Sequence, residues 1–169
     1  MFTLQHSFKL TQYGTINQMI VEFFASFLIW FLFAGLGMLW MIDGKIKKEQ
    51  VIHALMSCLF AWAVVVTIKY FFPTLRPFVV NGGDVGVVVP PFDGAFPSWY
   101  TATAFALSVS VFMNDRKIGW WFLLSAVIIG ISRVLANVHY PIDIVGGALI
   151  GTLVAVVVEK THFFKVLDI

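Results

Sequence analysis

Long apolar runs separated by short polar breaks dominate the chain. Five such runs are found, at 19–42, 51–72, 98–113, 118–136 and 141–158. A helix needs about 20 mostly apolar residues to cross the hydrocarbon core of a bilayer. The pattern therefore predicts an all-α integral membrane protein with about five transmembrane helices. The run 98–113 is the shortest and begins with polar residues, so we expect it to start below the headgroup level.

Two stretches lie outside this pattern. Residues 1–18 are polar to amphipathic, which is typical of a segment that lies at the membrane interface. Residues 73–96 are rich in glycine and proline and predict a loop, and loops of this length are usually functional or disordered. The sequence 1–169 shows no internal repeat and is interpreted as a single membrane domain.

Composition strengthens the membrane assignment. The chain is 60% hydrophobic and 12% charged, and its mean hydropathy of +0.91 is outside the range of soluble globular domains. A formal net charge of +2 without a basic run gives no support for nucleic-acid binding. The single cysteine, Cys58, lies inside an apolar run, so no disulfide framework is expected.

The distribution of basic residues predicts the orientation. Seven of the eleven Lys and Arg residues fall in segments that five crossings would place on one face, namely Lys45, Lys47, Lys48, Arg116, Lys117, Lys160 and Lys165. By the positive-inside rule this face is cytoplasmic, together with the C-terminus. We therefore expect a multi-pass protein of the cell (plasma or inner) membrane whose 73–96 loop and 132–143 junction are extracytoplasmic.

Three cations come together on that outer face because alternate ends of the helices meet there. They are Lys69 at the end of the second run, Arg76 in the loop and Arg133 at the end of the fourth run. Forked arginine donors suit phosphate oxygens, and Ser98 at a helix start adds a hydroxyl and free N–H groups. Taken singly, each has an ordinary alternative: a snorkelling lysine, interfacial arginines and a plain N-cap serine.

The same face carries His139 and Asp143, four residues apart across Pro141. A carboxylate on one ring nitrogen leaves the other nitrogen free to attack or to accept a proton. A helix-capping pair is the alternative interpretation. The remaining histidines, His6, His53 and His162, fall in other regions, and one histidine with carboxylates is a poor zinc site, so no metal is expected.

The order and spacing of these residues resemble the three-part signature of the type 2 phosphatidic acid phosphatase (PAP2) superfamily. The matching positions are Lys69, Arg76, Pro77, Pro97, Ser98, Ser132, Arg133, His139 and Asp143. The resemblance implies a metal-independent and cofactor-independent phosphatase that acts through a phosphohistidine. In that scheme His139 is the nucleophile and Asp143 orients it. The phosphoryl group is held by Lys69, Arg76, Ser98 and Arg133.

The second motif departs from the family pattern. Pro-Ser-x-His becomes Pro-Ser-Trp99-Tyr100, so Tyr100 stands where the family has a histidine that protonates the leaving oxygen. A phenol is poorly matched to this task near neutral pH, and loss of a general acid costs roughly 10²–10⁴-fold in rate. Reduced activity is therefore expected, above all on substrates with a poor leaving group. An acid from the loop, Asp84 or Asp93, is the alternative.

Size and orientation resemble the small bacterial members that dephosphorylate undecaprenyl diphosphate, although many members have six spans. Phosphatidic acid and phosphatidylglycerol phosphate are the alternative substrates. A catalytically impaired protein that only binds a lipid phosphate is the alternative to an enzyme. A lipid transporter would show paired broken spans, which the sequence does not indicate.

Overall fold

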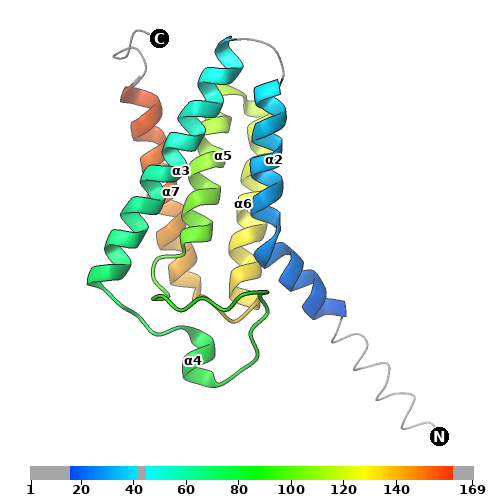
Figure 1. The fold of residues 1–169 in the computed structure, drawn as a ribbon, viewed down its shortest axis with the longest axis vertical. Helices are drawn as coiled ribbons and strands as arrows, with labels where there is room; N and C mark the ends of the chain where they lie inside the picture. The colour runs from blue at the N-terminus through cyan, green and yellow to red at the C-terminus, as the bar shows by residue number, and fades with distance from the viewer. Residues whose placement is uncertain (1–15, 42–44, 162–169) are drawn as a thin grey trace, which may run out of the picture.

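The fold is a helical bundle whose chain runs up and down between two ends (Figure 1). The computed structural model describes residues 16–41 and 45–161, and all regular structure in these ranges is helical. The expectation of an all-α protein is therefore confirmed. The elements are α2 (Leu28–Met41), α3 (Lys45–Phe71), α4 (Pro77–Asn81), α5 (Trp99–Asn114), α6 (Arg116–Leu135) and α7 (Pro141–Thr161).

The helices differ in whether their length and hydropathy allow them to cross a bilayer. Among the described helices, α3, α6 and α7 are long and apolar enough to do so. The helical segment Ile16–Ser26 and α2 make a fourth crossing only if they are taken together. The 16-residue α5 is shorter than a usual span. About five spans were predicted, with 98–113 as the shortest, and the count of five is not confirmed.

The first predicted span, 19–42, is bent rather than straight. The segment Ile16–Ser26 meets α2 at an angle of 45°. Near this bend the guanidinium of Arg133 donates a hydrogen bond to the carbonyl of Ala25 at 3.1 Å. A side chain bonded to a helix carbonyl is a known cause of such kinks. The predicted interfacial lead-in 1–18 lies largely outside the described residues, since only its last three are described, and these are helical.

Helix α5 is the centre of the bundle and packs mainly against α7, α6 and α3 (Figure 1). Its buried side chains are mostly small, including Ala102, Ala104 and Ala106, so neighbouring helices approach it closely. The closest approach is with α7. A Cβ atom at Gly147 would lie 2.5 Å from the carbonyl oxygen of Ser98, and one at Gly151 would overlap the carbonyl of Ala102. Glycine is thus required where α7 crosses α5.

The same three helices are joined by polar contacts at the end opposite the loop. Glu159 of α7 accepts a hydrogen bond from Ser110 of α5 at 2.5 Å. Its other carboxylate oxygen lies 3.3 Å from the ring of His53 on α3. Buried carboxylates are stable in such surroundings only when their oxygens are paired. This cluster therefore fixes α3, α5 and α7 relative to one another.

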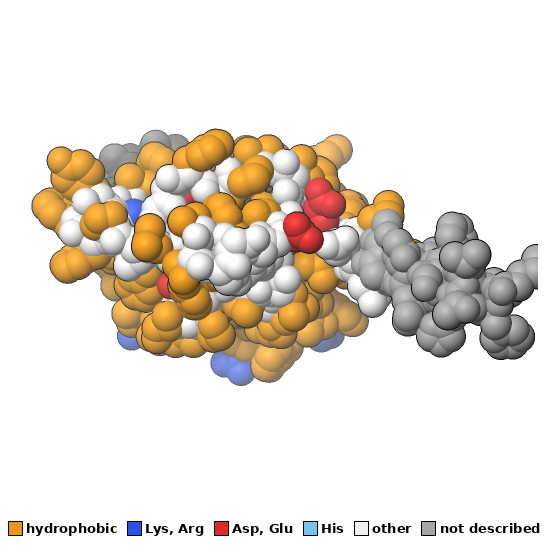
Figure 2. Space-filling view, turned by 90° about the horizontal axis from the view of Figure 1, so that it is seen from below, with side chains coloured by type: hydrophobic (Ala, Val, Ile, Leu, Met, Phe, Trp, Pro, Cys, Tyr) orange, Lys and Arg blue, Asp and Glu red, His pale blue; other side chains and the backbone are white. Residues whose placement is uncertain are grey.

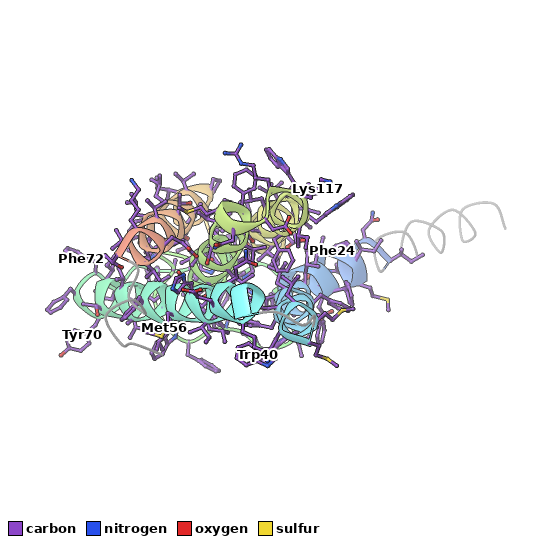
Figure 3. The ribbon with its side chains drawn as sticks, turned by 90° about the horizontal axis from the view of Figure 1, so that it is seen from above. Phe24, Trp40, Met56, Tyr70, Phe72 and Lys117 are labelled. Carbon is purple, nitrogen blue, oxygen red and sulfur yellow. The ribbon has the colours of Figure 1, made fainter. Side chains whose placement is uncertain are left out.

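The outer surface of the bundle is strongly apolar. Large side chains that point away from it include Trp40, Tyr70 and Phe72, as Figure 3 shows. Tyr70 is 81% exposed and Phe72 is 66% exposed. Exposure of so many large apolar side chains is unusual for a soluble monomer. The surface is that of a protein surrounded by lipid.

Candidate active site

The residues singled out in the sequence lie at one end of the bundle, where the loop, α4 and the α6–α7 junction meet (Figure 1). The helices position them simply. Lys69 is in the last turn of α3, Arg133 is in the last turn of α6, and Asp143 is in the first turn of α7. Arg76 immediately precedes α4, and Ser98 immediately precedes α5. All of these side chains are buried, as is His139.

His139 and Asp143 form a buried pair. The Nδ1 atom of His139 lies 3.3 Å from Oδ2 of Asp143, and the side chains are 0% and 2% exposed. The same carboxylate oxygen accepts the backbone N–H of Tyr140 at 2.8 Å. Because α7 begins at Pro141, the carboxylate is in its first turn, where a negative charge is stabilised. The carboxylate of Asp143 thus contacts the ring nitrogen of the histidine that it was predicted to orient.

The second nitrogen of His139 contacts Arg76. Nη1 of Arg76 lies 3.2 Å from Nε2 of His139 and donates to the carbonyl of Val138 at 2.8 Å. A guanidinium has only donors, so Nε2 is the acceptor and carries the lone pair. Nδ1 then carries the proton that faces Asp143. This tautomer leaves Nε2 as the nitrogen able to attack an electrophile.

Burial lowers the pKa of His139 to about 4, below its ordinary value of 6.5. The hydrogen bond with Asp143 acts in the opposite direction, while the positive charges of Arg76 and Arg133 add to the lowering. The imidazole is therefore neutral near pH 7. A neutral imidazole is the form that acts as a nucleophile or a base.

Asp93, in the loop, connects two of the predicted cations. Lys69 Nζ lies 2.7 Å from Oδ2 of Asp93, and Arg76 Nη2 lies 2.6 Å from Oδ1. Lys69 and Arg76, called the cation pair below, also donate to the carbonyl of Gly94 at 2.6 Å and 3.1 Å. Nε of Arg76 adds a bond of 2.8 Å to the carbonyl of Asp93. The cation pair thus binds the loop strongly.

The sequence identified Asp93 only as an alternative acid. Partial burial acts to raise the pKa of its carboxyl, but the hydrogen bonds and charges of Lys69 and Arg76 outweigh this and hold the pKa below its ordinary value. Asp93 is thus a carboxylate, which disfavours the general-acid interpretation. Asp84 is exposed, and in the described part of the chain no ion pair joins it to the cation pair.

Ser98 lies at the N-cap position of α5 but makes no side-chain capping bond. Its hydroxyl instead accepts a hydrogen bond from Thr101 at 3.1 Å. Its backbone N–H donates to the carbonyl of Asp143 at 3.0 Å. The alternative interpretation of Ser98 as a plain N-cap therefore does not hold, and the close α5–α7 crossing brings Ser98 next to the His–Asp pair.

Arg133 and Tyr100 form a cation–π pair. The guanidinium of Arg133 lies over the Tyr100 ring, 4.2 Å from its centroid, which is a favourable cation–π distance. The Trp99 and Tyr100 rings are 4.0 Å apart. Arg133 therefore reaches the site from the α6 side, and its positive charge acts on His139 through space.

A cavity of about 380 Å³ adjoins Arg76 and Asp93. Its lining includes Arg76, Phe78, Pro91, Phe92 and Asp93. Apolar side chains surround the edge of this end of the molecule, as Figure 2 shows. In residues 16–41 and 45–161 there is no group of three or more His, Cys, Asp or Glu side chains arranged to hold a metal ion.

The bundle and its buried His–Asp pair beside clustered cations define a multi-pass membrane protein of the phosphatase class. The chain belongs to the PAP2 superfamily, whose family model matches residues 50–166. The resemblance seen in the sequence is thereby confirmed.

Two similar proteins come from Bacillus. The bacitracin transport permease protein BcrC of Bacillus licheniformis is 30% identical over 150 residues, which are 89% of this chain and 73% of that protein. Undecaprenyl-diphosphatase BcrC of Bacillus subtilis is 27% identical over 163 residues, 95% of this chain and 80% of that protein.

Solved structures agree with the fold. LpxE of Aquifex aeolicus superposes with a TM-score of 0.73 and 28% identity over 86% of each chain. A PAP2-type phosphatidylglycerolphosphate phosphatase of Bacillus subtilis gives 0.59 at 21% identity, covering 79% of this chain and 66% of the other, and shows the fold alone. This chain is accordingly a membrane lipid phosphatase.

Proposed function

We propose that this protein removes the terminal phosphate of undecaprenyl diphosphate, without a metal ion, through a phosphohistidine at His139. The observation that carries the proposal is the neutral His139, held by Asp143 on Nδ1 and facing Arg76 on Nε2. The names of the relatives from Bacillus subtilis and Sulfolobus acidocaldarius, both undecaprenyl-diphosphatases, support the choice of substrate.

In the proposed reaction, Nε2 of His139 attacks the terminal phosphorus. The bond to the bridging oxygen breaks, and this oxygen leaves on undecaprenyl monophosphate. Asp143 compensates the positive charge that develops on the imidazole. Lys69, Arg76, Ser98 and Arg133 stabilise the phosphoryl oxygens, which is where catalysis of phosphoryl transfer mainly resides. Water then attacks the phosphohistidine, releasing inorganic phosphate and restoring His139.

Tyr100 takes the position of the proton donor in this scheme. A diphosphate leaving oxygen is weakly basic and requires little protonation, whereas an alkoxide requires a full proton. Reduced activity on monoesters such as phosphatidic acid and phosphatidylglycerol phosphate follows. The substitution at position 100 thus favours a diphosphate over either of these substrates.

The site is proposed to face the extracytoplasmic side of the cell membrane. Lys48, Arg116, Lys117 and Lys160 lie at the opposite end of the bundle from the loop. The positive-inside rule assigns that end, with the C-terminus, to the cytoplasm.

The test is phosphate release from undecaprenyl diphosphate, phosphatidic acid and phosphatidylglycerol phosphate in detergent with EDTA. We expect release chiefly from the diphosphate, and acid-labile phosphate on the quenched wild-type enzyme but not on His139→Ala. Asp143→Asn should retain a slow residual rate, because an orienting carboxylate is less essential than the nucleophile. Activity that requires a divalent ion, or full activity in His139→Ala, would contradict the mechanism.

A further inference from the structure

Asp93 forms ion pairs with Lys69 and Arg76, the two cations that a substrate phosphate has to contact. Each oxygen of its carboxylate is bound by a different member of the cation pair, at 2.7 Å and 2.6 Å. This two-point contact is the one that a phosphoryl group would make with a lysine and an arginine. The loop thus supplies an anion of its own where the bound anion is expected.

Of the three side chains in this contact, that of Asp93 is the most accessible to an incoming anion. The side chains of Lys69 and Arg76 are 6% and 2% exposed, whereas that of Asp93 is 46% exposed. Asp93 and its neighbour Phe92, which is 96% exposed, border the cavity beside Arg76. On the cavity side, Arg76 is therefore covered by a solvent-accessible carboxylate, whose other oxygen binds Lys69.

We propose that Asp93 is a specificity-determining residue, whose carboxylate must be displaced from Lys69 and Arg76 and which thereby excludes singly charged phosphodiester head groups in favour of terminal phosphates. This inference rests on the proposed function and concerns the same site.

The discrimination follows from charge. A terminal phosphate carries about −1.5 to −2 charges near neutral pH and three strong acceptor oxygens. A phosphodiester carries one negative charge, as the carboxylate does. The tethered carboxylate also competes at an effective concentration in the millimolar range or above. A monoanion therefore gains little binding free energy by replacing the carboxylate of Asp93, whereas a dianion gains the attraction of its additional charge.

Such discrimination matters at a membrane surface. Anionic phospholipids are abundant there, and basic clusters attract them. A bare lysine–arginine pair next to the exposed Phe92 would bind phosphodiester head groups, and these would occupy the site without being hydrolysed. Asp93 neutralises one of the two charges and prevents this occupation.

A purely structural role for Asp93 predicts a different effect of its removal on anion binding. If the carboxylate only held the cation pair in position, its removal would weaken the binding of every anion. If it competes with the substrate, removal strengthens anion binding and strengthens that of monoanions most. Asn keeps the size of the side chain, so Asp93→Asn separates the two roles. Asp84→Asn is the matched control, since it removes the same charge from the same loop away from the cation pair.

The binding test uses methyl phosphate and dimethyl phosphate as soluble probes, with the rise in unfolding temperature as the readout. Wild type and Asp84→Asn should favour methyl phosphate by about tenfold or more, as expected if one extra charge is worth about 1.4 kcal/mol or more at this site. In Asp93→Asn the ratio should fall to about threefold or less, mainly through tighter dimethyl phosphate binding. An unchanged ratio, or weaker binding of both probes in Asp93→Asn, would refute the proposal.

A second measurement needs only the wild-type protein. At about pH 5 methyl phosphate is mainly a monoanion, because its second ionisation lies near pH 6. Asp93 remains ionised there, since the cation pair lowers its pKa. Affinity for methyl phosphate should then fall to that for dimethyl phosphate. An affinity that is the same at about pH 5 and about pH 7.5 would argue against displacement of a carboxylate.

The catalytic arm measures phosphate release from undecaprenyl diphosphate in micelles with increasing phosphatidylglycerol, using phosphatidylcholine to control for dilution. We expect phosphatidylglycerol to inhibit Asp93→Asn at concentrations about tenfold lower than wild type or Asp84→Asn. Equal inhibition of all three would overturn the proposal. If no protein releases phosphate from any lipid, the proposed function fails, and the binding test still decides the role of Asp93.

Discussion

At the scale of single residues, the environment of His139 explains how an imidazole close to two arginines stays unprotonated. Burial opposes its charged form, and Arg76 and Arg133 add repulsion, while Asp143 compensates only in part. Arg76 has an unusual position, because its Nη1 contacts Nε2 and its Nη2 binds Asp93. Movement of Arg76 onto a substrate phosphate would therefore free the nucleophile at the moment of binding.

The lowered pKa of His139 predicts an unusual pH dependence. The neutral form is present above the pKa of about 4. Phosphoenzyme formation at saturating substrate should therefore persist as the pH falls through 6.5, the ordinary value, and should be lost only near pH 4. Rapid-quench trapping of acid-labile phosphate across this range measures it. A half-point near 6.5 would show instead that the ring is solvated.

Tyr100 is predicted to limit turnover of monoesters. Tyr100→His should raise phosphate release from phosphatidic acid by up to about 10²-fold and that from a diphosphate much less, because only the alkoxide needs a strong proton donor. Trp99→Gly is included in a double variant, since the two rings are 4.0 Å apart and the indole can block the imidazole. Tyr100→Phe, which keeps the ring beneath Arg133, is the control. No change in any variant would place the proton donor elsewhere.

At this scale, the sequence predicted contacts between residues that are close along the chain. The pairing of His139 with Asp143 follows from a spacing of four residues at a helix start, which is a local geometry. The bonds from Asp93 to Arg76 and Lys69 span 17 and 24 residues, across the glycine- and proline-rich loop and the short α4. No periodic pattern relates such positions, so the partner of Lys69 and Arg76 could not be predicted. The bonding of Ser98 was missed for a similar reason, because it depends on α7.

At the scale of helices, the crossing of α5 and α7 determines the geometry of the site. The carbonyl of Ser98 packs on Gly147, and one turn further along α7 the carbonyl of Ala102 packs on Gly151. This contact brings the N–H of Ser98 to the carbonyl of Asp143. Apolar runs predicted where these helices lie, but not how closely they cross, because a run shows length and not the facing partner.

Gly151→Ala is predicted to destabilise the protein and to lower activity. The added methyl would overlap the backbone of α5, and such overpacking typically costs about 1–3 kcal/mol. Unfolding followed by tryptophan fluorescence, together with phosphate release, measures both effects. Gly37→Ala is the matched control, because a Cβ atom there meets nothing within 4 Å. Equal behaviour of the two variants would show that the crossing has room to relax.

At the scale of the whole molecule, hydropathy and the positions of basic residues predicted the alternation of the chain between two ends. The bend between Ile16–Ser26 and α2 was not predicted, since it coincides with a bond from Arg133, more than a hundred residues away. The apolar pattern identified 98–113 as the shortest run but did not show that it lies at the centre of the bundle. The structure shows that α5 is a short helix packed mainly against the longer α7, α6 and α3.

The orientation of the molecule is predicted to place the loop outside the cell. In a Cys58→Ser background, Asp84→Cys should react with a membrane-impermeant maleimide in intact cells, and Lys117→Cys should react only after lysis. Both positions are exposed and lie at opposite ends of the bundle. The reverse pattern would require a cytoplasmic substrate pool.

The shortness of α5 has a consequence for the depth at which chemistry takes place. Its 16 residues span about 24 Å at about 1.5 Å per residue, whereas the hydrocarbon layer is about 30 Å thick. With Arg116 and Lys117 placed at the far interface, we expect Ser98 and the neighbouring His–Asp pair to lie several ångströms beneath the plane of the lipid head groups. A substrate phosphate must therefore sink into the bilayer, and the buried arginines and lysine serve there as its counterions in place of water. The thickness of the surrounding bilayer thus becomes a determinant of how readily substrate enters and inorganic phosphate departs.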